Sequence, residues 1–165
     1  MLAKLAIPTA EGVFTAHYSQ QGLAKLDFPD DRAVAGKSEN ETVALSTEIR
    51  RWHQLTITAL NEALAGRASR DLPPLDLSSG TEFQRRVWNA LRRIASGRTL
   101  SYAEVAAKVG NSRATRAVGG ACGANPIPVL VPCHRVLAAH QALGGFSGGL
   151  GWKRKLLARE GIAFH

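Results

Sequence analysis

The chain has 165 residues, which is enough for one or two small domains with buried cores. It contains no apolar run of about 18 residues, so we expect no transmembrane helix, and residues 1–4 do not begin the long apolar segment of a signal peptide. Two cysteines give no disulfide framework, which favours a reducing, cytoplasmic location.

The net charge of +8 is divided unevenly along the chain. Residues 1–80 hold 8 Lys/Arg and 10 Asp/Glu, whereas residues 81–165 hold 13 Lys/Arg and only 3 acids, a net +10. A basic half of this kind attracts a polyanion, because each neutralised phosphate releases counterions. A merely basic surface or a membrane-surface patch would have the same charge. The charges are spread through amphipathic segments rather than in a tail, so nucleic acid is the favoured partner.

Three short apolar runs open the chain, at residues 2–7, 13–18 and 23–28, and turn-like segments separate them. This pattern predicts an antiparallel meander of three strands. Residues 29–40 are polar and predict a loop. Apolar residues recur at helical spacing over 41–64, which predicts a helix ending before Gly66.

Residues 68–80 have the composition of a linker between domains, with Asp71-Leu72-Pro73-Pro74 followed by Ser78-Ser79-Gly80. The sign of the charge changes across the same segment. We therefore expect a supporting α/β domain at residues 1–75 and a functional domain at residues 76–165.

The second half predicts a helix-turn-helix. Thr81 can cap a first helix that runs to Ile94, and Ser101 with Glu104 forms a capping box that opens a helix over 102–109. Gly110 then makes a tight turn, and Ser112 can cap a second helix that ends at Cys122. Helix, short glycine-containing turn and helix give the outline of this DNA-binding motif.

The second of these helices has two contrasting faces. Its predicted core side comprises Ala114, Val118, Ala121 and Cys122, and its outer side comprises Arg113, Arg116, Gly119, Gly120 and Gly123. Small residues around an isolated Arg116 suit close approach to a narrow groove of DNA. The alternative is an ordinary helix pair whose glycines permit close packing.

The apolar run Val129-Leu130-Val131 predicts a buried strand that Pro132 closes, because proline lacks the ladder donor. A thiol, an imidazole and a guanidinium follow directly, at Cys133, His134 and Arg135. A glycine-rich loop at residues 143–149 fits neither a phosphate loop nor a dinucleotide fingerprint. It is better interpreted as a wall whose backbone N–H groups face a ligand.

These residues suggest a cysteine nucleophile, although a small buried structural cysteine is the alternative. The pKa of a thiol falls beside cationic groups, and Cys133 has His134 and Arg135 next to it. Cys133 is favoured over Cys122, which falls on the buried side of a helix. Consecutive strand residues point to opposite faces, so we expect water to relay the proton from Cys133 to His134. Glu160 is the candidate group to orient that base.

Metal catalysis is not expected. His17 and His53 are isolated and are interpreted as surface or packing residues, and no cysteine precedes Cys122. The two cysteines and His134 make a poor ligand set.

Several blocks of sequence carry a resemblance to a known family. They are Phe83-Gln84-Arg85-Arg86-Val87-Trp88, Ser101-Tyr102-Ala103-Glu104, Arg116-Ala117-Val118-Gly119-Gly120-Ala121, Asn125-Pro126, Ile127-Pro128-Val129-Leu130-Val131-Pro132-Cys133-His134-Arg135-Val136 and Ser147-Gly148-Gly149. In type and order they resemble the O6-alkylguanine-DNA alkyltransferases, also called methylated-DNA–protein-cysteine methyltransferases. The resemblance is dense over residues 75–161 and covers the first half only in length and pattern.

The resemblance implies an α+β fold and a single-turnover DNA repair reaction. The first domain would be a ribonuclease H-like meander with a helix, and the second a mainly helical, winged helix-turn-helix-like domain. Cys133 would attack the alkyl carbon on guanine O6, and each molecule would act once. His134 would take the thiol proton through water, with Asn125 and Glu160 holding the network, and Tyr102 would donate a proton toward guanine N3.

The resemblance also implies contacts with DNA and with the extruded base. Arg116 would fill the gap left by the flipped nucleotide. The implied DNA-binding residues are Ser101, Arg113, Arg116, Ala117, Gly119, Gly120 and Arg135. The implied substrate-binding residues are Val136, Phe146, Ser147 and Lys153, with the backbone of Cys133 and Val136 reading the amino group and the Ser147 N–H contacting O6. The partner would be double-stranded DNA carrying O6-alkylguanine or O4-alkylthymine, bound by a monomer that can cluster on DNA, with no cofactor and no metal.

The sequence departs from the family pattern at two places: Phe146 replaces a frequent tyrosine, and Gly123-Ala124 replaces a larger basic or polar pair. Two rival functions remain open. One is a lesion sensor with an inert Cys133, although relatives that bind lesions without repairing them lack the nucleophile. The other is a cysteine hydrolase that uses Cys133, His134 and Glu160.

Overall fold

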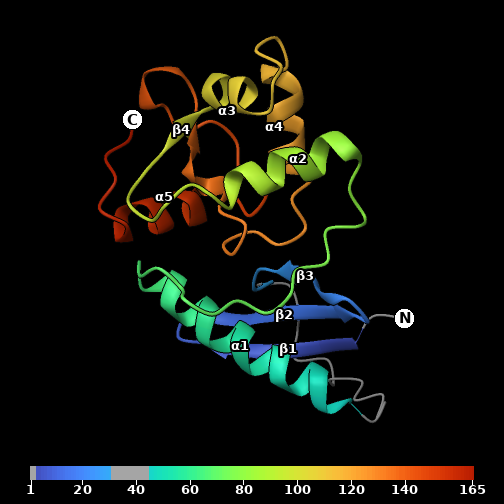
Figure 1. Ribbon diagram of the computed structural model, residues 1–165. Helices are drawn as coiled ribbons and strands as arrows, with labels where there is room; N and C mark the ends of the chain where they lie inside the picture. The colour runs from blue at the N-terminus through green and yellow to red at the C-terminus, as the bar shows by residue number, and fades with distance from the viewer. Residues whose placement is uncertain (1–2, 31–44) are drawn as a thin grey trace.

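The N-terminal half is an antiparallel sheet with one helix (Figure 1). The computed structural model describes residues 3–30 and 45–165. Strands β1 (Ala3–Thr9), β2 (Gly12–Ser19) and β3 (Gly22–Asp27) pair in sequence order, as the meander prediction required. Helix α1 (Thr47–Leu64) follows them. The predicted start of this helix at residue 41, and residues 31–40 of the predicted loop, lie outside the described residues.

Alternation along β2 explains why one face of the sheet is a core. Phe14, Ala16 and Tyr18 are fully buried, while the residues between them are partly exposed. Helix α1 begins at Ser46, whose side chain accepts a hydrogen bond from the backbone of Ile49. The sheet and α1 together form the lower lobe in Figure 1.

The predicted linker is docked on the sheet. The Leu23 backbone N–H donates to the Pro74 carbonyl at 2.8 Å, and the Asp76 N–H donates to the Leu23 carbonyl at 2.8 Å. Leu75 thereby forms an isolated parallel bridge with Leu23. Buried residues of both halves belong to one hydrophobic cluster, so the core is continuous across this segment.

The C-terminal half is mainly helical and forms the upper lobe in Figure 1. Its helices are α2 (Glu82–Leu91), α3 (Tyr102–Lys108), α4 (Thr115–Gly123) and α5 (Leu150–Arg159). Two short strands, β4 (Leu100–Ser101) and β5 (Val136–Leu137), pair in parallel between them. None of the described helices is both long and apolar enough to cross a membrane.

The predicted start of α2 and the capping box of α3 are confirmed, but the predicted cap of α4 is wrong. Thr81 and Ser101 both make reciprocal capping boxes. Helix α4 begins after Ala114, with no side-chain cap, rather than at Ser112. The reason is a turn around Asn111, whose side chain and carbonyl accept the N–H groups of Arg113 and Ala114.

The predicted two faces of α4 are present. Val118, Ala121 and Cys122 are buried, whereas Arg116 and Gly120 are exposed. Helix α2 was predicted to run to Ile94 but ends at Leu91, about one turn earlier.

The predicted strand at residues 129–131 is wrong. The segment is a turn in which Val129 has φ 74° and the Val131 N–H donates to the Ile127 carbonyl. Prolines at 126, 128 and 132 remove three backbone donors, so the segment has too few N–H groups for a ladder. The turn leads directly into the short 3₁₀-helix η1 (Cys133–Arg135), which precedes β5.

Candidate active site

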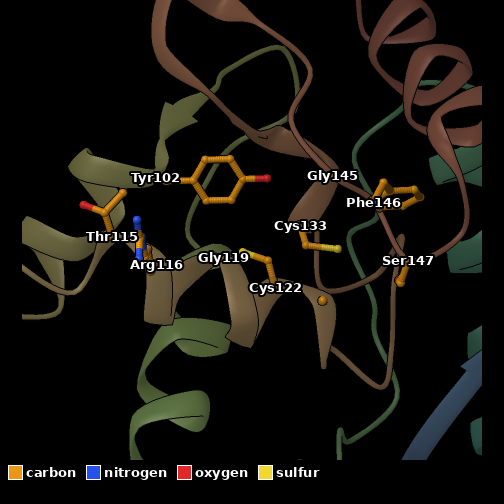
Figure 2. A pocket seen from close by; sticks show the side chains of 10 residues that line it. Tyr102, Thr115, Arg116, Gly119, Cys122, Cys133, Gly145, Phe146 and Ser147 are labelled. Atoms are coloured by element: carbon orange, nitrogen blue, oxygen red, sulfur yellow. The ribbon is translucent and has the colours of Figure 1, made fainter.

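A pocket of about 460 Å³ lies between α3, α4 and the glycine-rich loop. Its lining residues are Tyr102, Thr115, Arg116, Gly119, Cys122, Gly123, Cys133, Gly145, Phe146 and Ser147. In Figure 2, Thr115 and Arg116 lie on one side of the pocket, with Phe146 and Ser147 on the opposite side. Both cysteines lie between these two sides, below Tyr102.

Cys133 begins the 3₁₀-helix and is 3% exposed. Burial raises the pKa of its thiol, while a hydrogen bond with the Asn125 side chain and the charge of Lys153 lower it. Asn125 is held by two hydrogen bonds, from its amide nitrogen to the Val131 carbonyl at 2.8 Å and from the Ile127 N–H to its oxygen at 3.0 Å. The turn therefore presents a protonated thiol to the pocket beside a fixed amide.

His134 is 1% exposed, and its Nε2 lies 3.1 Å from Oε1 of Glu160. Its Nδ1 is buried and has no hydrogen-bond partner among the described residues. Burial lowers the pKa of the imidazole more than the Glu160 carboxylate raises it, so the ring is neutral at neutral pH. A neutral ring fixed at one nitrogen and free at the other is suited to accept a proton.

Glu160 joins His134 to Arg135. The Arg135 guanidinium donates to both carboxylate oxygens, with Nε at 3.1 and 3.0 Å and Nη2 at 2.7 Å. Burial alone would raise the pKa of Glu160, but the hydrogen bonds and charges of His134 and Arg135 lower it to about 2. The carboxylate is therefore ionised throughout the neutral range.

Tyr102 is the first residue of α3, and its ring forms the roof of the pocket in Figure 2. Burial raises the pKa of its hydroxyl to about 12, so the phenol keeps its proton at neutral pH. A Cβ on Gly144 would lie 2.9 Å from this hydroxyl, so a glycine is needed where the loop passes Tyr102.

The comparisons with known proteins agree with this geometry. Residues 82–162 match the family model described as the DNA-binding domain of 6-O-methylguanine DNA methyltransferase. The crystal structure of Mycobacterium tuberculosis OGT in complex with DNA is 35% identical, with a TM-score of 0.74, and the match covers 96% of this chain and 92% of that one. The chain belongs to the O6-methylguanine-DNA methyltransferase family.

Other relatives agree with this assignment. The methylated-DNA–protein-cysteine methyltransferase of Haemophilus influenzae is 49% identical over 85 residues, which cover 52% of this chain and 48% of that protein. The Mycolicibacterium paratuberculosis protein of the same name is 49% identical over 104 residues, or 63% of this chain and 62% of that protein. The match therefore spans about half to three fifths of these curated relatives. The structure of the Pyrococcus kodakaraensis methyltransferase is 26% identical, with a TM-score of 0.59, and the match covers 98% of this chain and all of that one.

The structure gives Arg135 a different environment from the expected DNA contact. Its side chain is 13% exposed. Besides its bonds to Glu160, it donates from Nη1 to the Ile94 carbonyl at 2.6 Å. All three guanidinium nitrogens of Arg135 donate hydrogen bonds within the protein, so this arginine stabilises the active site by holding Glu160 in place.

The expected substrate contacts Lys153 and Val136 do not line the pocket. Lys153 is fully buried, and its Nζ donates to the carbonyls of Val136 at 2.8 Å and Gly145 at 3.1 Å. The amine also lies 5.9 Å from the centre of the Tyr102 ring. Lys153 therefore ties β5 to the glycine-rich loop.

The remaining predicted residues fall into two groups. Arg116 and Gly119, which were predicted to bind DNA, and Phe146 and Ser147, which were predicted to bind the substrate, all line the pocket. Arg113, Ala117 and Gly120 are exposed on or beside α4, and Ser101 caps α3.

Three residues of the pocket were not among the predicted site residues, namely Thr115, Cys122 and Gly123, whereas Gly145 belongs to the predicted wall at residues 143–149. Cys122 was assigned only to the core, and it is indeed 93% buried, but it also faces the pocket. The adjacent Gly123 is the sequence feature that could have indicated this position of Cys122. Gly123 has no side chain to cover the last turn of α4, and nothing lies within 4 Å of where its Cβ would be.

The described residues contain no cluster of three or more His, Cys, Asp or Glu side chains that could hold a metal ion. The two isolated histidines have packing partners instead. His17 Nε2 lies 2.8 Å from Asp27 Oδ2, and His53 Nδ1 lies 2.9 Å from the Tyr18 hydroxyl.

Proposed function

We propose that the protein repairs DNA by transferring the alkyl group of O6-alkylguanine, and of O4-alkylthymine, to Cys133. The observation that carries this proposal is the buried Cys133 on the floor of a pocket beside a neutral, oriented His134. The names of the relatives, methylated-DNA–protein-cysteine methyltransferases, support the same reaction.

The reaction is a single displacement. Sγ of Cys133 forms a bond to the alkyl carbon while the bond from that carbon to O6 breaks. The electron pair of the broken bond stays on the base, which leaves as neutral guanine once it takes a proton at N3 from the Tyr102 hydroxyl. The thiol proton passes to His134, and exchange with solvent returns the imidazole and the phenol to their resting forms. The thioether is not hydrolysed, so each molecule acts once.

A base is needed because burial keeps Cys133 protonated at rest. No hydrogen bond joins its thiol to His134 among the contacts of the described residues, and Nδ1 of His134 has no partner there. One water bound between Sγ and Nδ1 would complete the path. Glu160 holds the ring and stabilises the imidazolium that forms transiently.

The pocket reaches guanine only if the base leaves the duplex. Atom O6 is inaccessible for in-line attack within stacked DNA, so the nucleotide has to be extruded. Arg116 lies at the mouth of the pocket on an otherwise small-residue helix face and is suited to occupy the vacated place. Arg113, Ala117, Gly119 and Gly120 would approach the backbone around it. The bound partner is double-stranded DNA carrying the lesion.

The finer architecture follows the same proposal. Residues 76–165 would act as a winged helix-turn-helix-like domain, with α3 and α4 as its helix-turn-helix. Residues 1–75 would form a ribonuclease H-like supporting domain. We expect a monomer that can cluster on DNA. Because the reaction consumes a free thiol, we place it in the reducing cytoplasm.

Stoichiometry separates this function from its rivals. Protein titrated with duplex DNA carrying radiolabelled O6-methylguanine should take up label until it reaches about one methyl per molecule, since a thioether is not turned over. A lesion sensor with an inert thiol would bind the DNA without taking up label. A cysteine hydrolase would release many product molecules per protein.

A further inference from the structure

The wall of the pocket rests on an aromatic residue of the N-terminal half. Phe28 follows β3, and its ring centre lies 5.8 Å from that of Phe146, nearly perpendicular to it. A Cβ built on Gly148 would lie 2.5 Å from Cε2 of Phe28. The glycine-rich loop therefore packs directly on this ring, and only a glycine fits at the point of contact.

Phe28 is itself firmly held. Its ring centre lies 5.5 Å from that of Phe14 on β2 and 5.1 Å from that of Trp152 on α5. The next residue, Pro29, packs closely on Gly12. A Cβ added to Gly12 would lie 2.7 Å from Cβ of Pro29. The ring is thus fixed by β2 and by α5, and the residue after it packs on the first residue of β2.

The same end of β3 also contacts the turn that precedes Cys133. The Leu26 N–H donates to the Pro126 carbonyl at 2.9 Å. Pro126 follows Asn125, whose side chain is one of the groups that lower the pKa of the Cys133 thiol. Two separate stretches of the site, residues 125–126 and 146–148, therefore rest on residues 26–28.

Among the described residues, α5 provides the other attachments of this loop. The Lys153 side chain donates to the Gly145 carbonyl, and the Lys153 backbone N–H donates to the Gly149 carbonyl at 3.3 Å. Gly145, Phe146 and Ser147 all line the pocket. The two ends of the wall are therefore tied to α5, and the Phe28 ring supports the stretch between them through Phe146 and Gly148.

We propose that Phe28 is a positioning residue for the wall of the alkyl pocket, so that the N-terminal half helps to set which alkyl groups reach Cys133. This inference rests on the proposed alkyl transfer. Phe28 does not line the pocket, and it acts through Phe146 and Gly148. Displacement of the ring would move Phe146 and Ser147, and a bulky alkyl group would be affected more than a methyl group.

A paired substitution tests the contact. Gly148→Ala places a methyl group against the Phe28 ring and pushes the loop away from it, whereas Phe28→Leu makes room for that methyl group. The measured quantity is the ratio of transfer rates for O6-benzylguanine and O6-methylguanine in the same duplex. We expect Gly148→Ala to change this ratio by about tenfold. A misplacement of about 1 Å can change a rate by as much as about 100-fold, so a tenfold change in the ratio is within reach. We expect the double variant Phe28→Leu/Gly148→Ala to return to within about threefold of Phe28→Leu alone.

A matched control separates positioning from loss of stability. Leu60→Ala removes a fully buried side chain of α1, which should lower the unfolding temperature without changing the ratio of the two rates. If Gly148→Ala does not fold, Phe28→Ala becomes the test variant and should itself change the ratio.

Two results would overturn the inference: effects of the two substitutions that simply multiply, or a ratio that follows the unfolding temperature in all variants, Leu60→Ala included. Failure of the wild-type protein to take up any alkyl group would instead refute the proposed function.

Discussion

The hydrogen-bonded trio of His134, Arg135 and Glu160 should govern both stability and reaction rate. In Glu160→Gln the side chain keeps its shape and loses its charge. Arg135, only 13% exposed, then lies next to a neutral amide, and His134 loses the carboxylate that orients its ring. We expect this single substitution to destabilise the protein and to slow alkyl transfer.

The magnitude follows from the burial of the pair. Breaking a buried ion pair by removing one charge costs about 3–5 kcal/mol. The amide oxygen of Gln retains one acceptor, so we expect the low end, about 3 kcal/mol. For a chain of this size that corresponds to a fall of about 6–12 °C in the unfolding temperature. Loss of the oriented base should slow transfer by about 100-fold, the low end of what a positioned base contributes.

The pH dependence of the free energy of unfolding gives a second, independent test of the role of Glu160. The folded pKa of Glu160 is depressed, to about 2 from its ordinary 4.5. Its contribution to the free energy of unfolding is therefore fully present above pH 4.5 and is lost as the pH falls toward 2. The difference in stability between the wild type and Glu160→Gln should shrink over the same range.

Chemical denaturation at several pH values measures this difference, and single-turnover alkyl transfer measures the rate. Glu82→Gln is the matched control, because Glu82 is an exposed acid in the first turn of α2 and its loss should cost less than about 1 kcal/mol. A Glu160→Gln protein as stable and as fast as this control would refute the reasoning.

Three further substitutions test separate parts of the site. Arg116→Ala should slow transfer from duplex DNA by about tenfold or more but leave the rate with free O6-benzylguanine unchanged, because only the duplex has to be unstacked. Equal losses of rate on both substrates would show that Arg116 does not fill the place of the extruded nucleotide. Tyr102→Phe should lower the single-turnover rate by about 100-fold through loss of the proton donor, and an unchanged rate would exclude that role. Lys153→Met should slow transfer without weakening DNA binding in a filter or gel assay, since Lys153 ties the Gly145 carbonyl to β5 from inside the protein; weaker DNA binding at an unchanged rate would contradict this.

Local sequence signals predicted the elements that depend on local chemistry. The meander follows from three short apolar runs separated by turn-like segments, and the starts of α2 and α3 follow from the capping residues Thr81 and Ser101. Glu160 was selected as the only acid near the C-terminus, and it does pair with His134 and with Arg135.

Two kinds of feature escaped prediction: a turn imposed by nearby prolines, and contacts between residues distant in the sequence. The run Val129-Leu130-Val131 has the composition of a strand, but three prolines and the Asn125 side chain fix it as a turn. The contact of Arg135 with the Ile94 carbonyl joins residues 41 positions apart, and the DNA contact that the resemblance implies for Arg135 stays a prediction. The support of the pocket wall by Phe28 joins residues more than 100 positions apart, and no pattern along the chain reveals it.

The most direct test of the central claim is a map of the alkyl adduct. The protein is incubated with duplex DNA carrying O6-methylguanine and digested, and its peptides are weighed by mass spectrometry. We expect one added methyl group, on the peptide that contains Cys133, and none in Cys133→Ser, which should still bind the DNA. An unmodified Cys133 in protein that binds the lesion tightly, or a methyl group on Cys122, would contradict it.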